Sequence, residues 1–184
     1  MKRLVLVLAG FLVSHVATAQ EGDRYGILPN PDLYKQSSPR DALASVVLAI
    51  ERERYDYLAA HLMPKDYIDS RILKSAGYFE KVAAEQLAGT AQGASLKGPE
   101  LQARVRQKAE LLGFKYLTDA MSKKLADEPD NLITLKRFLR EGKFEEAGEA
   151  ATVTVEGVKG YSIFLRKVEG RWFFENRREE PAKE

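Results

Sequence analysis

The 184-residue sequence contains no cysteine. It can therefore form no disulfide, thiolate metal site, cysteine nucleophile or cysteine-linked lipid anchor, and its fold must depend on its core. Of its two histidines, only His61 lies beyond the first 19 residues. No Glu-x-x-His, His-x-His or metalloprotease helix motif surrounds it. The sequence consequently indicates no metal site and no cofactor.

The sequence also lacks an apolar run long enough to cross a bilayer, which takes about 20 residues. Its longest run, Leu4 to Val13, instead follows Lys2 and Arg3 and precedes the small-x-small triplet Ala17-Thr18-Ala19. This three-part pattern predicts a signal peptide over residues 1–19, cleaved after Ala19. The alternative is an uncleaved membrane anchor. We expect a protein exported to the periplasm or the outside, with no membrane span after cleavage.

An excess of one charge sign is missing from the predicted mature chain. Removal of Lys2 and Arg3 from the 29 basic residues leaves as many as the 27 acidic ones. This balance of charge does not fit a nucleic-acid or anionic-membrane binder, although it does not exclude a local patch of one charge sign.

Helical periodicity covers most of the chain after an irregular leader at residues 20–37, which either packs on the domain or acts as a tether. We expect one domain over residues 38–178 and a disordered tail at 179–184. Ser38 and Pro39 predict a helix start, and Pro64 to Leu73 predicts a short helix with Tyr67, Ile68 and Leu73 buried. Further helices are expected over 79–87, from Pro99 to Pro129, and from a cap at Asp130 or Asn131 to Gly142. Gly113 weakens the longest of them.

Strand periodicity replaces helical periodicity after Gly142. Alternating β-branched and aromatic residues predict strands at 151–155, 161–166 and 171–175, with a short first strand at 144–147. Glu169-Gly170 predicts a tight hairpin turn. Trp172 and Phe174 share one face, which we expect Ile163 or Leu165 to meet from the neighbouring strand. Phe164 and Phe173 lie on the other face, which either the long helix, a partner or a second subunit in a homodimer covers.

The fold class is therefore α+β, with N-terminal helices packed on a C-terminal antiparallel β-meander. The strands Ala151-x-Val153-x-Val155 and Tyr161-x-Ile163-x-Leu165, with Gly170-Arg171-Trp172 and the opening helix at Ser38, resemble the NTF2-like superfamily of SnoaL-like or cystatin-like α+β rolls. The resemblance implies a curved sheet around a conical pocket. It carries over no catalytic residue, and the helical middle at 64–141 departs from the family pattern.

One polar-aromatic cluster could carry chemistry. It contains Tyr57, His61, Asp66 and Asp69, together with Tyr55 and Tyr67. A tyrosine and an aspartate in an apolar pocket can polarise a carbonyl and move a proton. The alternative is structural, with tyrosines at a helix–sheet boundary, aspartates at helix starts and a histidine at the edge of the core.

Two functional hypotheses follow. The first is an exported non-catalytic module that binds a small ligand or a protein partner. The second is a cofactor-free isomerase or dehydratase-like enzyme that uses Tyr57, His61 and Asp66 or Asp69. Convergence of these side chains in one enclosed pocket would separate the two.

Overall fold

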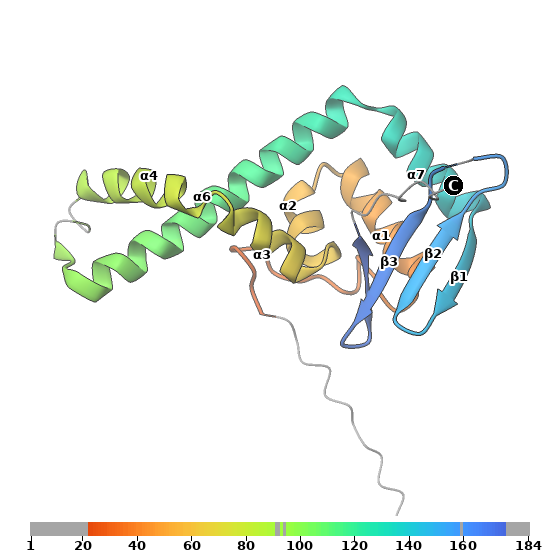
Figure 1. Cartoon of the computed structure of the whole chain (residues 1–184), viewed down its shortest axis with the longest axis horizontal. Coiled ribbons are helices and arrows are strands. Elements are labelled where there is room, and N and C mark those ends of the chain that lie inside the picture. The colour runs from red at the N-terminus through yellow and green to blue at the C-terminus, as the bar shows by residue number, and fades with distance from the viewer. Residues whose placement is uncertain (1–21, 91–92, 94, 159, 176–184) are drawn as a thin grey trace, which may run out of the picture.

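The computed structural model describes residues 22–90, 93, 95–158 and 160–175. Helices come first in the chain, and a four-stranded antiparallel meander follows and packs against helix α1 (Figure 1). The predicted α+β class is confirmed. The predicted signal peptide at 1–19 and the predicted tail at 179–184 lie outside the described residues.

Helix α1 (Pro39–Glu51) begins where the sequence predicts. The Ser38 hydroxyl accepts a hydrogen bond from the Asp41 backbone N–H at 3.1 Å, and Pro39 occupies the first turn. This cap satisfies one of the orphan donors at the start of the helix. The buried face of α1 is broad and lies over the sheet; it comprises Ala42, Leu43, Val46, Val47, Ala49 and Ile50.

Three short elements follow, namely α2 (Tyr55–Tyr57), the π-helix η1 (Leu58–Leu62) and α3 (Lys65–Leu73). The Met63 N–H bonds the Leu58 carbonyl at 3.1 Å, which is the wide turn of a π-helix. In α3, Ile68 and Ile72 are buried, but Leu73 is 68% exposed. The prediction that Leu73 is buried is wrong, because one residue beyond Ile72 turns about 100° away from the buried stripe.

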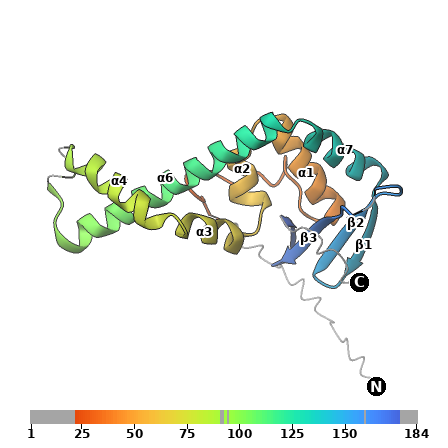
Figure 2. The same ribbon diagram turned by 45° about the horizontal axis from the view of Figure 1, so that its top comes forward.

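An arm projects from the domain. Helix α4 (Ala76–Ala88) packs back along the first half of α6 (Gly98–Asp127), and both views show the pair extending away from the sheet (Figures 1 and 2). The arm has a small core of its own around Phe79, Ala83 and Ala109. Close packing explains the glycine at position 113 of α6, because a Cβ there would lie 2.9 Å from Ile72 Cγ2.

Helix α7 (Asp130–Glu141) returns the chain to the sheet beside α1. Its N-cap is Pro129, so the prediction of a cap at Asp130 or Asn131 is wrong; the chain enters the helix one residue earlier. Gly142 ends the helix as predicted, with an extended backbone at φ −65°. Glycine is required by space, because a Cβ at this position would lie 2.1 Å from the Phe138 carbonyl oxygen.

The sheet contains β1 (Lys143–Ala147), β2 (Ala150–Thr154), β3 (Ile163–Val168) and β4 (Arg171–Glu175), in that order. Glu169 and Gly170 both have positive φ, 50° and 83°, which confirms the predicted tight turn. The register places Lys167 opposite Trp172 and Leu165 opposite Phe174. Leu165 therefore meets the face of Trp172 and Phe174, as expected, while the residue directly opposite Trp172 is Lys167, because the two-residue turn pairs Val168 with Arg171 first.

The two faces of the sheet differ in what they contact. Trp172, Leu165 and Val153 are buried on the face toward α1 and α7, in the main core. Met121 and Leu125 of α6 also pack on this core. Phe164 and Phe173 lie on the opposite face and are 8% and 6% exposed, so they present no open apolar patch.

Candidate functional site

An apolar cleft of about 280 Å³ lies between the inner face of the sheet and the corner where α6 meets α7. Its floor consists of buried aliphatic side chains from α1, the loop after η1, α7 and β3, namely Val46, Ile50, Met63, Leu135 and Ile163. Its walls are the partly buried side chains Met121, Leu125 and Phe174. We call this set of residues the sheet cleft. Its size is near the lower end of the range of about 300–1,000 Å³ that is usual for ligand pockets.

The mouth of the sheet cleft is polar. Lys124, Glu128, Asn131, Ser162 and Glu175 line it. The Asn131 side-chain amide donates to the Glu128 carboxylate at 2.7 Å, so these two residues hold one another across the first turn of α7. An apolar floor with a few polar groups at the mouth suits a mainly hydrophobic ligand with one polar end.

Tyr161 also borders the sheet cleft and lies edge-on to Phe138, with ring centroids 5.4 Å apart. Burial raises the pKa of its hydroxyl above the usual value. The phenol therefore stays protonated at neutral pH and can donate or accept a hydrogen bond. Met63 in the floor and Met121 in the wall make the cleft adaptable, because an unbranched thioether fits ligands of different shape.

Tyr57 and His61, the two central residues of the predicted cluster, are 3% and 1% exposed. The Tyr57 hydroxyl accepts a hydrogen bond from the Asn30 backbone N–H at 2.8 Å. His61 Nε2 lies 2.8 Å from the Ile27 carbonyl oxygen, to which a protonated Nε2 donates. Both residues thus bind the backbone of the leader, and η1 turns His61 toward it.

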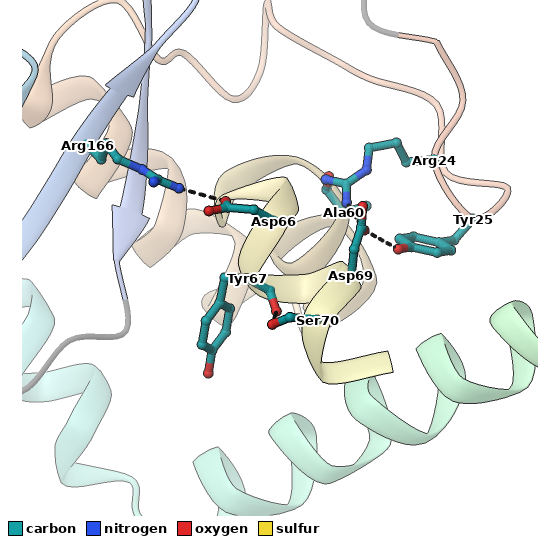
Figure 3. A network of polar contacts seen from close by, with 8 residues as sticks. All are labelled: Arg24, Tyr25, Ala60, Asp66, Tyr67, Asp69, Ser70 and Arg166. Carbon is teal, nitrogen blue, oxygen red and sulfur yellow. Dashed lines mark hydrogen bonds and ion pairs between the residues drawn. The ribbon is translucent and has the colours of Figure 1, made fainter. Parts of the chain in front are cut away.

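Asp66 and Asp69 lie on α3 and face two different parts of the chain (Figure 3). Asp66 pairs with Arg166 of β3 at 2.6 Å, and hydrogen bonding to that guanidinium lowers the pKa of the carboxyl. Asp69 accepts from the Arg24 guanidinium at 2.9 Å and from the Tyr25 hydroxyl at 2.5 Å. The two carboxylates border one open pocket of about 530 Å³, but each is bound to a different arginine.

The pKa of Tyr25 is strongly shifted. Burial, followed by hydrogen bonding and repulsion from the Asp69 carboxylate, raises the pKa of Tyr25 to about 12. Its ring stacks on Phe114 of α6 with centroids 4.3 Å apart. Tyr25 joins the leader to both α3 and α6, and the phenol stays protonated at neutral pH.

The leader also pairs with β4, one of the two edge strands of the sheet. The Trp172 N–H donates to the Gln36 carbonyl at 3.0 Å, and the Gln36 side-chain amide donates to the Trp172 carbonyl at 2.8 Å. Tyr34 is buried and stacks on Tyr57 at 4.1 Å. Residues 20–37 were expected either to pack on the domain or to act as a tether. The contacts of residues 24–36 show that this part of the leader packs on the domain.

The sequence singled out none of the residues that face one another across the sheet cleft as a set. They come from α1, the loop after η1, α6, α7, the segment before β3 and two strands, and the apolar ones each follow the ordinary pattern of a core-facing residue. The only signal was the expectation of a pocket beside the sheet, which the family resemblance implied. The predicted cluster was visible because its members lie close together in the sequence, from Tyr55 to Asp69.

Comparison of the chain with protein-family models, curated proteins and solved structures finds no match. The resemblance to NTF2-like rolls consequently stays a prediction. In the part of the chain that the structure describes, no helix is long and apolar enough to cross a bilayer. No group of three or more histidines and carboxylates in the described ranges could hold a metal ion.

Proposed function

We propose that this chain is an exported, non-catalytic module that binds a small, mainly apolar ligand in the sheet cleft. The single observation that carries the proposal is the cleft itself, with its aliphatic floor and its polar mouth. Buried apolar surface supplies affinity at about 25 cal/mol per Å², and the polar mouth orients the ligand.

The positions of the predicted catalytic residues support a non-catalytic role over the isomerase-like alternative. A general base must reach the proton that it removes, directly or through one water. Tyr57 and His61 are buried against the leader backbone, while Asp66 binds Arg166 of β3 and Asp69 binds Arg24 of the leader. None of these four residues borders the sheet cleft.

The binding experiment uses the neutral fluorophore N-phenylnaphthylamine, whose emission rises in apolar surroundings. We expect the native chain to bind it and the variant Met121→Trp to bind it at least about tenfold more weakly, because the larger ring fills the cleft. Leu111→Trp is the matched control. It lies on the same helix, is 44% exposed and is outside the cleft.

Equal affinity in Met121→Trp and in the native chain would contradict the proposed site. Amide chemical shifts give a second test, since Leu135, Ser162 and Ile163 should respond to the probe while Gly113 should not. The export part of the proposal is tested by the mass of the chain after secretion. Its N-terminus should be Gln20, and a chain that retains Met1 would overturn it.

A further inference from the structure

The base of the arm carries a second pocket, of about 260 Å³, which lies along α6 on the N-terminal side of the sheet cleft. It lies where the end of α3, the start of α4 and the middle of α6 meet. Its floor is apolar and consists of Ile72, Phe79 and Leu117. We call it the arm-base pocket. It shares no lining residue with the sheet cleft.

The charge around the arm-base pocket has one sign. Arg71 and Lys74 line it, and none of its described lining residues carries a carboxylate. The two cations are three positions apart at the end of α3, which places them on the same side of that segment. Neither forms an ion pair with any residue in the described ranges. Asp119, one turn beyond Lys115 on α6, is already bound to Lys115 at 2.9 Å.

The walls of the pocket favour an aromatic body. Tyr116 is 64% exposed and its ring lies 5.7 Å from that of the buried Phe79 at 53°, so Tyr116 supplies the open aromatic surface at this wall. Aromatic rings gain affinity from tilted or stacked neighbours beyond what their buried area contributes. The hydroxyls of Tyr116 and Ser75 add hydrogen-bond donors at the rim.

Gly113 fixes the depth of the pocket. A Cβ at this position would lie 2.9 Å from Ile72 Cγ2 and 3.4 Å from Phe79 Cδ2, so only glycine lets α6 pass this close beneath the floor. The floor is therefore set by backbone packing of a long helix and is formed before any ligand arrives. Preformed sites lose less entropy on binding than sites that must order first.

From these observations we propose that the arm-base pocket binds a small organic anion, an aromatic carboxylate in its simplest form. The carboxylate would bind Arg71 and Lys74, and the ring would lie on Phe79 and Tyr116. Arg71 offers the planar fork that matches a carboxylate, and Lys74 adds a point charge. This site is separate from the proposed function, and either can hold without the other.

The test uses naphthoate as probe, with amide chemical shifts of the isotope-labelled chain as readout. We expect shifts at Ile72, Lys74, Ser75 and Gly113, and none at Ser162 or Ile163. The double variant Arg71→Gln with Lys74→Gln should bind at least about tenfold more weakly. The matched control is Lys81→Gln with Arg106→Gln, which removes the same charges from exposed positions on the arm and should bind within about twofold of the native chain.

Two further probes separate the parts of the proposal. Naphthalene carboxamide has the same rings without the charge, and inorganic phosphate has charge without rings. Each should bind at least about tenfold more weakly than naphthoate, and naphthoate affinity should fall as salt is added. Equal binding by the carboxamide or by phosphate would overturn the ligand class. Unchanged affinity in the Arg71 and Lys74 variant, or no shift at Gly113, would overturn the site.

Discussion

Replacement of Trp172 by alanine tests how much the packing of the sheet on the main core contributes to the stability of the fold. Trp172 is 2% exposed and lies in the main core on the face toward α1. An aromatic side chain buries about 150–250 Å². At about 25 cal/mol per Å² this corresponds to roughly 4–6 kcal/mol as an upper bound. The backbone hydrogen bond from Trp172 to Gln36 survives in Trp172→Ala, so the edge pairing contributes nothing to the difference.

We therefore expect Trp172→Ala to lower the free energy of unfolding by about 3–5 kcal/mol, a large share of the 5–15 kcal/mol typical of a whole domain. The assay is urea unfolding followed by far-ultraviolet circular dichroism, because the variant has no tryptophan to report. Leu28→Ala, at a position that is 72% exposed, should change stability by less than about 0.5 kcal/mol. The native chain should show blue-shifted tryptophan emission that iodide does not quench. A loss below about 1 kcal/mol, or ready quenching, would refute the core assignment.

Three further perturbations address the helix end, the leader and the buried histidine. Gly142→Ala should destabilise the chain by at least about 1–3 kcal/mol, because its Cβ would lie 2.1 Å from the Phe138 carbonyl oxygen; a thermal melt equal to the native one would contradict this. The pKa of Tyr25, raised to about 12, favours the protonated phenol in the folded chain. Its stabilising contribution is complete below the unfolded pKa of about 10 and is lost as pH rises toward 12. The difference in tyrosinate absorbance between the native chain and Tyr25→Phe should show this late titration, and a step near the ordinary value would exclude it. His61→Ala should cost about 1–3 kcal/mol, since it leaves a backbone carbonyl of the leader without its donor, while N-phenylnaphthylamine affinity stays within about twofold. A large loss of affinity in a folded His61→Ala chain would instead favour a role in binding.

Local patterns in the sequence determined the element types and several boundaries. Ser38 and Pro39 define a helix start through capping and a fixed φ, and both act on neighbouring residues only. Glu169 and Gly170 define a hairpin turn for the same reason, because the turn type depends on their own backbone angles. These features are local, so the α+β order of elements could be predicted before any contact was known.

Tertiary packing decided what these elements do. Nothing near Gln36 in sequence indicates that it pairs with Trp172, 136 residues away, or that Arg24 and Tyr25 meet Asp69. The two pockets arise from side chains of helices and strands that are distant in sequence. The predicted cluster shows the converse. Tyr57, His61, Asp66 and Asp69 are close in sequence, but they lie on three successive elements and bind different partners. Tyr57 and His61 bind the leader backbone, while Asp66 and Asp69 bind Arg166 and Arg24.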